Sequence, residues 1–196
     1  MKTDFDLMQM INSHQTNSSF ILGIDGLSRS GKTTFVMELQ DILVKESQDF
    51  HIFHIDDHIV ERARRYNTGY EEWYEYFQLQ WDTAWLTENF FRDLKNSNQI
   101  TLPFYDSQTD THQSKFIRLP KKGVIIVEGV FLQREKWRAF FDKVVYLDCT
   151  REQRFMRESQ ATQQNPAKFE NRYWKAEEYY LNVYNPTESA DVVIKT

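Results

Sequence analysis

The stretch Gly26-Leu27-Ser28-Arg29-Ser30-Gly31-Lys32-Thr33 decides the fold of this chain. It has the spacing G-x-x-x-x-G-K-[ST] that is typical of a phosphate-binding loop. The apolar run at 20–24 comes before it and predicts a strand, whereas the run at 34–43 has apolar residues at helical spacing and predicts a helix. The motif therefore lies between a strand and a helix, which is the context that such a loop requires.

Each fixed position of the motif has a physical role in binding phosphate. Gly26 and Gly31 allow the backbone to curl so that successive N–H groups point at phosphate oxygens, and the following helix adds the positive end of its dipole. Lys32 then reaches the β- and γ-phosphates, and the hydroxyl of Thr33 is a ligand for Mg²⁺. The sequence therefore predicts a nucleoside triphosphate site whose binding residues are Gly26, Ser28, Arg29, Ser30, Gly31, Lys32, Thr33 and Thr34.

The composition limits the remaining classes of protein. With 196 residues the chain fits a single domain, 1–196, with room for a small insertion. Its 24 basic and 29 acidic residues are interspersed, so we expect no nucleic-acid partner, and no apolar run is long enough to cross a membrane. Cys149 is the single cysteine, which excludes an intrachain disulfide. Residues 1–19 form a polar N-terminal extension without the apolar core of a signal peptide, so we expect a cytoplasmic protein.

Short continuous apolar runs predict the other strands of the sheet. After the first strand they lie at 50–55, 124–127, 144–147 and 190–194. Helical patterns lie between them at 134–141, 151–160 and 168–184. This order predicts an α/β protein with the three-layer P-loop NTPase fold, a five-stranded parallel sheet and right-handed crossovers.

The segment from about Tyr66 to Asn96 interrupts this alternation and is rich in aromatic residues. It predicts a helical insertion, which we place within an acceptor-binding subdomain at about 60–120. A β-ribbon belongs to the same subdomain, with arms at 100–106 and 115–119 and a tip at 107–114. The aromatic side chains either line an acceptor pocket or form the core or a subunit contact, so a homo-oligomer is an open alternative.

Acidic residues follow three of the predicted strands, at Asp56, Glu128 and Asp148, on the edge where open α/β sheets bind ligands. Asp56 and Asp57 come after the strand at 50–55, and either carboxylate can orient and deprotonate an acceptor hydroxyl unless both only stabilise a turn. Glu128 comes after the strand at 124–127 and either holds Mg²⁺, directly or through water, or caps a neighbouring helix.

Two further patterns bear on the reaction. Arg154 and Arg157 are three residues apart on one helical face, which makes them candidates for a lid over the phosphates. The chain has neither Asp-x-x-Gly nor Asn-Lys-x-Asp, so the γ-phosphate-sensing and guanine-reading elements of GTPases are missing. The residues therefore favour phosphoryl transfer to a hydroxyl group over GTP hydrolysis.

In this order the motifs resemble the uridine kinase-like family of P-loop kinases, the branch that includes uridine kinase, phosphoribulokinase and a pantothenate kinase type. The resemblance runs from Phe20 to Ile194 and rests on the segments 24–34, 55–57, 102–106, 127–130 and 190–194. It implies that the chain transfers the γ-phosphate of ATP, with Mg²⁺, to a hydroxyl of a small metabolite, most simply a nucleoside such as uridine.

The resemblance also implies roles for single residues. Asp56 matches the catalytic aspartate, Lys32 and Arg157 act with it, and Arg157 begins a lid at about 151–168. Thr33 and Glu128 are the implied metal ligands. The implied acceptor-binding residues are Asp57, Tyr105 and His112.

The chain departs from the family pattern on the acceptor side. It has Asp57-His58-Ile59 where the family carries an aromatic pair, and Gln80-Trp81-Asp82 where the family carries Asp-His-Pro. The dense arginines of the family lid are reduced to the stretch 157–160. The alternatives to a nucleoside kinase are therefore a kinase for pantothenate, a sugar phosphate or a vitamin riboside, and a nucleotide-gated binding protein with a kinase fold.

Overall fold

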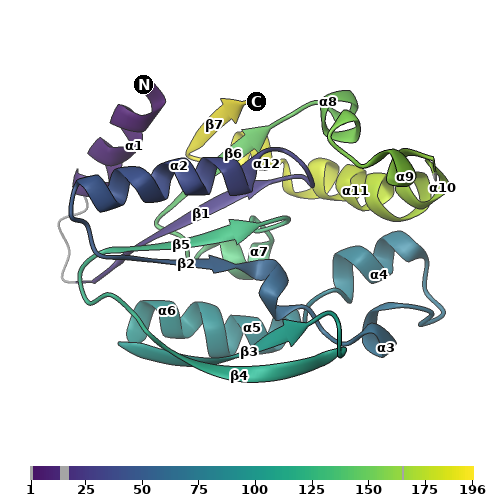
Figure 1. The fold of residues 1–196 in the computed structure, drawn as a ribbon, viewed down its shortest axis with the longest axis horizontal. Coiled ribbons are helices and arrows are strands. Elements are labelled where there is room, and N and C mark those ends of the chain that lie inside the picture. The colour runs from purple at the N-terminus through teal and green to yellow at the C-terminus, as the bar shows by residue number, and fades with distance from the viewer. Residues whose placement is uncertain (1, 14–17, 165) are drawn as a thin grey trace.

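The computed structural model describes residues 2–13, 18–164 and 166–196. Five parallel strands form its central sheet in the order β2-β5-β1-β6-β7 (Figure 1). These strands are β1 (Phe20–Gly26), β2 (Phe50–His54), β5 (Val124–Gly129), β6 (Lys143–Asp148) and β7 (Val192–Lys195). The prediction of a five-stranded parallel sheet is confirmed, and the strand ends lie within two residues of the predicted ones.

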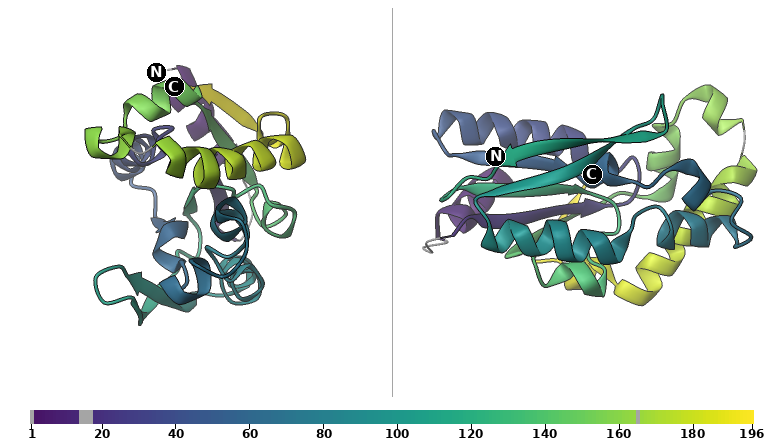
Figure 2. Two further views of the ribbon diagram at one scale, coloured as in Figure 1. Left: turned by 90° about the vertical axis from the view of Figure 1, so that its right-hand side faces the viewer. Right: turned by 90° about the horizontal axis from the view of Figure 1, so that it is seen from below.

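Helices cover the sheet and surround its carboxyl edge (Figures 1 and 2). They are α1 (Lys2–Ser13), α2 (Lys32–Lys45), α3 (Arg62–Arg65), α4 (Glu72–Gln78), α5 (Thr83–Leu86), α6 (Arg92–Asn96), α7 (Glu135–Arg138), α8 (Arg151–Met156), α9 (Gln160–Gln163), α10 (Pro166–Lys168), α11 (Lys175–Tyr184) and α12 (Pro186–Ser189). A 3-10 turn, η1 (Ile55–His58), follows β2, and the π-helical segments η2 (Thr87–Phe91) and η3 (Phe169–Trp174) precede α6 and α11.

Both faces of the sheet are buried because successive side chains of a strand point to opposite faces. Leu22 and Ile126 belong to the apolar cluster that α1 and α2 cover. Ile21 and Ile125 belong to a second cluster, which includes residues of α4, η2, α7 and α11. The sheet is therefore the middle of three layers, as predicted. None of the described helices is long and apolar enough to span a membrane.

The segment predicted as an insertion connects β2 to β5 and contains α3 to α6 and a two-stranded ribbon. The ribbon strands are β3 (Gln99–Asp106) and β4 (Thr111–Arg118), and Figure 2 shows them beside α6 below the sheet. The predicted tip at 107–114 is too long, because the strands stay paired as far as Asp106 and Thr111. The Asp106 carboxylate accepts a hydrogen bond from the Gln108 amide at 2.8 Å and so closes a turn that is shorter than the predicted tip.

The predicted helix at 151–160 is divided into α8 and α9. Ser159 starts the second helix, because its side chain caps it by accepting a hydrogen bond from the Thr162 amide at 3.2 Å. Position 165 in the predicted lid, and positions 1 and 14–17 in the predicted N-terminal extension, lie outside the described residues. Between 151 and 163 the predicted lid segment therefore consists of two short helices, of which the second begins at the Ser159 cap.

Asp191 joins β7 to β6 at the edge of the sheet. Its carboxylate accepts hydrogen bonds from the Val144 amide at 2.8 Å, from Lys143 at 2.9 Å and from Arg138 at 2.9 Å. Burial acts to raise its pKa, but the hydrogen bonds and the two basic side chains outweigh this and hold the pKa below the ordinary aspartate value. The ionised form is therefore favoured in the folded protein.

This arrangement predicts a pH-dependent contribution to stability. Because the folded-state pKa is lowered, Asp191 stabilises the fold above its unfolded-state pKa and loses this contribution as the pH falls through the folded-state value. We expect Asp191→Asn to lower the free energy of unfolding by about 1–3 kcal/mol at pH 7 and by progressively less toward pH 3. Urea unfolding across this pH range measures the difference, with the exposed Asp41→Asn as control. A difference of constant size at every pH contradicts the prediction.

Candidate active site

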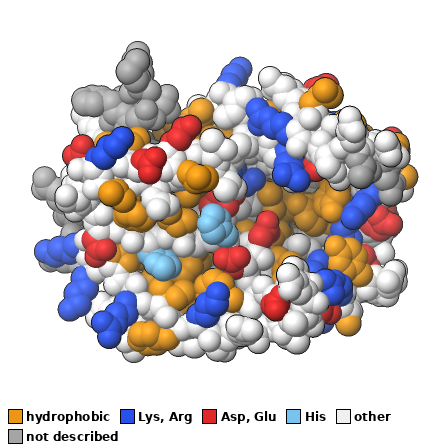
Figure 3. Space-filling model, viewed as in Figure 1, with side chains coloured by type: hydrophobic (Ala, Val, Ile, Leu, Met, Phe, Trp, Pro, Cys, Tyr) orange, Lys and Arg blue, Asp and Glu red, His pale blue; other side chains and the backbone are white. Residues whose placement is uncertain are grey.

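A cavity of about 900 Å³ opens at the carboxyl edge of the sheet. In Figure 3 it is a hollow with hydrophobic side chains inside and basic side chains along its upper rim. The phosphate-binding loop, η1, the end of β5 and the segment from α8 to α11 contribute the lining. Of the residues predicted for the site, those that line it are Ser28, Arg29, Gly31, Lys32, Thr33, Thr34, Asp56, Glu128 and Arg157.

Two glycines set the shape of the loop. Gly31 has a φ of +97°, a conformation that strains any residue with a Cβ, and it is the residue from which α2 starts. A Cβ at Gly26 would lie 2.6 Å from the Ser30 hydroxyl and 2.9 Å from the Leu147 carbonyl oxygen. Gly26 and the fully buried Ser30 therefore shape the loop from behind and do not line the cavity.

Three consecutive carbonyl groups of the loop accept hydrogen bonds from side chains of other parts of the chain. The Ser28 carbonyl accepts from Arg154 Nη1 at 3.2 Å, and the Arg29 carbonyl accepts from Arg157 Nη1 at 2.9 Å. The carbonyl of the next residue, Ser30, accepts from the Thr196 hydroxyl at 2.8 Å. A curled loop whose carbonyls are bonded outward can turn its amide groups toward an anion, which suits phosphate binding.

Lys32 and Glu128 face each other inside the cavity. Lys32 Nζ donates to the Leu27 carbonyl at 3.1 Å and lies 3.9 Å from Glu128 Oε1. Burial lowers the pKa of Lys32, and the negative charge of Glu128 opposes this effect. The other oxygen of Glu128, Oε2, is 2.7 Å from His54 Nδ1, and this hydrogen bond raises the pKa of His54. The Glu128 carboxylate is therefore held from both sides.

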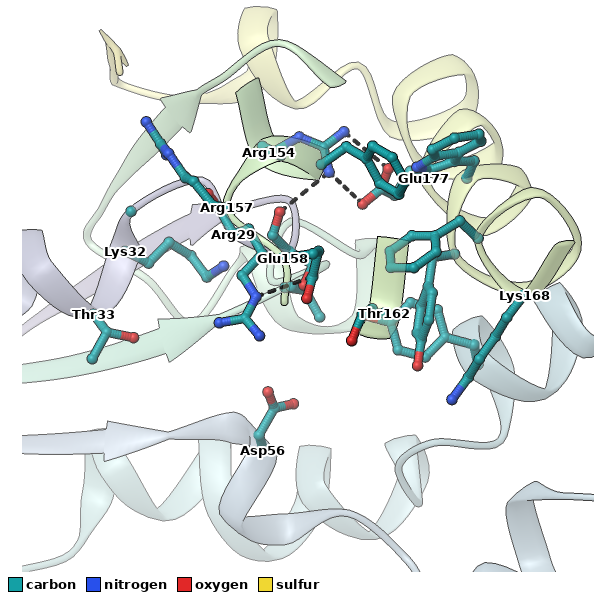
Figure 4. Close-up of a pocket in the computed structure, with 18 of the residues that line it drawn as sticks. Arg29, Lys32, Thr33, Asp56, Arg154, Arg157, Glu158, Thr162, Lys168 and Glu177 are labelled. Carbon is teal, nitrogen blue, oxygen red and sulfur yellow. Dashed lines mark hydrogen bonds and ion pairs between the residues drawn. The ribbon is translucent and has the colours of Figure 1, made fainter. Parts of the chain in front are cut away.

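Asp56 lies in η1, directly after β2, and faces the loop across the cavity (Figure 4). Burial raises its pKa, the charge of Lys32 lowers it, and Glu128 adds to the rise. Its position depends on Gly129 in β5, where a Cβ would lie 2.1 Å from Cγ2 of Ile55. Glycine at this position therefore lets the segment that carries Asp56 pass close to β5.

Asp57 and Tyr105, predicted on the acceptor side, lie outside the cavity lining. Asp57 follows Asp56 in η1. The Tyr105 hydroxyl donates to Asp110 Oδ1 at 2.7 Å and accepts from Arg65 Nη2 at 3.1 Å. The β-ribbon and α3 therefore engage Tyr105, and its contact with an acceptor stays a prediction.

His112, the third of these residues, also lies outside the lining. Its Nδ1 is 2.9 Å from Glu61 Oε1, and its Nε2 is 2.8 Å from the Ile59 carbonyl oxygen. Both ring nitrogens are therefore engaged by the chain between η1 and α3. Acceptor binding by His112 would require it to exchange one of these partners.

Arg154, the other candidate for the lid, is held by an ion pair inside the protein. It is buried, and its guanidinium donates to both carboxylate oxygens of Glu177 at 2.7 and 2.9 Å and to the Cys149 carbonyl at 3.2 Å. Burial raises the pKa of Glu177, and the hydrogen bonds from Arg154 oppose this. Arg154 therefore joins α8 to α11 and to the loop, whereas Arg157 bonds only to a loop carbonyl among the described contacts.

Two groups of residues were missed by sequence reasoning. The first is a wall of the cavity made by Phe155, Thr162, Lys168, Phe169, Tyr173, Trp174 and Glu177. Tyr76 from α4 joins this wall, and it belongs to the aromatic segment for which a pocket role was one of the alternatives. The rings of Phe155 and Phe169 are 5.2 Å apart, centroid to centroid, and those of Phe155 and Trp174 are 5.6 Å apart. The i,i+4 spacing of Phe169 and Tyr173 was a usable signal for this wall.

The second missed group surrounds Asp25, a fully buried carboxylate next to the loop. Asp25 accepts hydrogen bonds from the Tyr180 hydroxyl at 2.6 Å, from Gln133 Nε2 at 3.0 Å and from the Leu132 amide at 3.2 Å. Burial raises its pKa. These bonds fix the end of β1, where the loop begins, against α11.

A phosphate-binding loop after the central strand and carboxylates after two neighbouring strands define an α/β protein of the P-loop kinase fold. The sequence profile of the Phosphoribulokinase / Uridine kinase family matches residues 21–164. The chain belongs to this family, as its motifs predicted. It is 32% identical to a uridine kinase of Staphylococcus haemolyticus and 33% identical to one of Staphylococcus aureus, over 143 residues in each case.

These matches cover 70% of this chain and 65% of the curated relatives, so the chain spans less than two thirds of their length. A solved structure of a possible uridine kinase from Bacillus stearothermophilus is 50% identical, covers 98% of both chains and has a TM-score of 0.86. A D-glycerate 3-kinase from Cryptococcus neoformans is 14% identical, covers 96% of this chain and 87% of its own, and has a TM-score of 0.61. This last likeness shows the fold alone.

The buried Arg154–Glu177 pair predicts that a substitution at Glu177 destabilises the fold far more than one at the neighbouring Glu178. We expect Glu177→Gln to lower the free energy of unfolding by about 3 kcal/mol, because the buried guanidinium loses its negative partner. The matched control is Glu178→Gln, since Glu178 pairs with Arg151 at 2.7 Å on the exposed side of the same helix. That change should cost less than about 1 kcal/mol. Equal losses for the two variants in urea unfolding would contradict a structural role of the buried pair.

Proposed function

We propose that this protein is an ATP- and Mg²⁺-dependent kinase that transfers the γ-phosphoryl group to a hydroxyl of a small metabolite, most simply a nucleoside such as uridine. The observation that carries the proposal is that Asp56 shares one cavity with the phosphate-binding loop, Lys32 and Glu128. This arrangement supports a role for the Asp56 carboxylate, which is open to the cavity, as the acceptor of the hydroxyl proton. The names of the similar uridine kinases support the same choice of acceptor.

The donor set of the cavity fits Mg²⁺ that binds together with a nucleotide. Within the described part of the chain, no group of three or more His, Cys, Asp and Glu side chains could hold a metal ion alone. Mg²⁺ usually keeps several waters and binds through one or two carboxylates plus phosphate oxygens, so the Thr33 hydroxyl and the Glu128 carboxylate suit it as ligands. When bound, the ion neutralises charge on the phosphate oxygens.

Different residues of the chain then bind the phosphates and accept the proton. The loop residues Gly26 to Thr34 and the Lys32 ammonium hold the phosphates, and Arg157 adds positive charge beside the loop. The acceptor oxygen forms a bond to the γ-phosphorus as the bond to the bridging oxygen of the leaving diphosphate breaks. The acceptor proton passes to Asp56, whose raised pKa makes it a better proton acceptor than an ordinary carboxylate.

The proposal predicts that a substitution at Asp56 slows phosphoryl transfer without weakening the binding of ATP. We expect Asp56→Asn to lower kcat by about 10²- to 10⁴-fold, because the amide cannot take the proton, while ATP affinity changes little. Asp57→Asn is the matched control, since Asp57 lies outside the cavity lining, and its effect on kcat should be much smaller. Mass spectrometry of a panel of nucleosides, vitamins and sugar derivatives, incubated with Mg-ATP, would follow the gain of one phosphoryl group.

Two results would contradict the kinase proposal. One is a turnover that Asp56→Asn leaves unchanged. The other is tight ATP binding without a phosphorylated product from any member of the panel, which would favour a nucleotide-gated binding protein.

The bond between His54 and Glu128 predicts a positioning role for His54 in metal binding. Asn places its amide nitrogen near the position of histidine Nδ1, so we expect His54→Asn to preserve the bond to Glu128 and His54→Ala to remove it. The alanine variant should bind Mg²⁺ about tenfold more weakly in the nucleotide complex, and the asparagine variant should recover most of this loss. Calorimetric Mg²⁺ titrations of the nucleotide-bound variants test this, and equal affinities for both variants would contradict it.

A further inference from the structure

Among the described contacts, one basic side chain of the cavity has neither an ion pair nor a hydrogen bond. Five basic residues line the cavity, and three of them form ion pairs there: Arg29 with Glu158, Lys32 with Glu128, and Arg154 with Glu177. Arg157 bonds to the loop. Lys168 is left, because it forms no ion pair or hydrogen bond among the contacts of the described residues.

Lys168 lies at the end of the cavity away from the phosphate-binding loop. In Figure 4 its side chain projects toward the open space from the side opposite Lys32 and Thr33, and Asp56 lies between these two ends of the view. Lys168 Nζ is 5.8 Å from the centroid of the Tyr173 ring. The cavity therefore leaves room for an acceptor whose hydroxyl meets Asp56 and whose other end reaches Lys168.

The surface around Lys168 is aromatic. Phe169 and Tyr173 lie in η3, their ring centroids are 5.4 Å apart, and Tyr76 contributes a ring from α4 with its centroid 4.9 Å from that of Tyr173. Flat side chains of this kind pack well against a planar ring, and the exposed Lys168 ammonium beside them can pair with an anion on the same molecule.

The acidic residues on this side of the cavity do not balance Lys168. Glu158 and Glu177 already pair with arginines, and Glu128 is held by Lys32 and His54. Asp56 faces the loop, where its charge lies close to that of Lys32. The acceptor end of the cavity therefore combines flat apolar surface with one positive charge that no carboxylate of the cavity neutralises.

We propose that the acceptor joins a planar ring to an anionic group, a carboxylate or a phosphate, and that Lys168 pairs with this anion. The ring packs against Tyr173 and Phe169, and the hydroxyl that is phosphorylated reaches Asp56. The inference rests on the proposed kinase function and narrows its substrate class from hydroxylated metabolites in general to anionic ring compounds. Lys168 is then a specificity-determining residue.

Three probes with the same ring and the same free 5′-hydroxyl test this proposal: uridine, orotidine, which adds a carboxylate to the ring, and uridine 3′-phosphate. Their affinities are measured by calorimetry on the full chain with Mg²⁺ and a non-hydrolysable ATP analogue. We expect at least one anionic probe to bind about tenfold more tightly than uridine, the size of one charge-assisted hydrogen bond. Which of the two binds tightly distinguishes a carboxylate from a phosphate acceptor.

Variants assign the preference to Lys168. Lys168→Gln should remove the difference between the anionic probe and uridine, and Lys168→Arg should restore it, with the affinity for the ATP analogue unchanged in both. Lys175→Gln is the matched control, because Lys175 lies outside the cavity lining and pairs with Glu71 at 3.7 Å. It should retain the full preference.

The proposal is overturned if uridine binds as tightly as both anionic probes, if none of the probes binds, or if the preference survives in Lys168→Gln. Phosphoryl transfer from Mg-ATP to each probe is followed separately. An anionic probe that binds through Lys168 but is never phosphorylated supports this inference and counts against the kinase function. Uridine phosphorylated as efficiently as the anionic probes supports the kinase function and overturns this inference.

Discussion

A loop that turns its amide groups toward an anion must satisfy its carbonyl groups on the opposite side, and much of this structure serves that constraint. The three consecutive carbonyls at 28–30 accept hydrogen bonds from Arg154, Arg157 and Thr196. These donors come from α8, from its C-terminal end and from the residue after β7. Elements far from the loop in sequence therefore fix its curvature, which is why the motif alone does not specify the geometry of the site.

Helix α11 is the element that makes these contacts rigid. Glu177 and Tyr180 are three residues apart on one face of α11, and both are buried. Glu177 holds the guanidinium of Arg154, and Tyr180 donates to the carboxylate of Asp25 just before the loop. Helix α11 therefore contacts the residue that precedes the loop and, through Arg154, the Ser28 carbonyl within the loop. Loss of the Glu177 carboxylate would leave the Arg154 guanidinium without its partner, and loss of the Asp25 carboxylate would do the same to the Tyr180 hydroxyl. Both contacts therefore stabilise the fold and the site together.

The sequence predicted those parts of the site that follow from local order along the chain. The strands were recognisable as apolar runs, and the ends of parallel strands meet at one edge, which placed Asp56 and Glu128 correctly in the cavity. The aromatic wall was not predictable in this way, because it exists only where the segment at 155–174 folds back over the loop. Arg134 illustrates the same limit: sequence reasoning places arginine at the surface, yet its guanidinium stacks on the Phe77 ring and burial lowers its pKa to about 10.

The two ends of the cavity differ in whether their charged side chains already have partners of opposite charge. At the loop end, Lys32 and Glu128 hold each other, and His54 fixes the second oxygen of Glu128. Under the proposed function, a nucleotide phosphate would take the place of Glu128 beside Lys32 and leave one oxygen of Glu128 for the metal ion, so these groups would exchange partners without large movements. At the other end, the described contacts give Lys168 the Tyr173 ring but no carboxylate. Acceptors are therefore expected to differ most in affinity there, because an anionic acceptor would supply the missing negative charge.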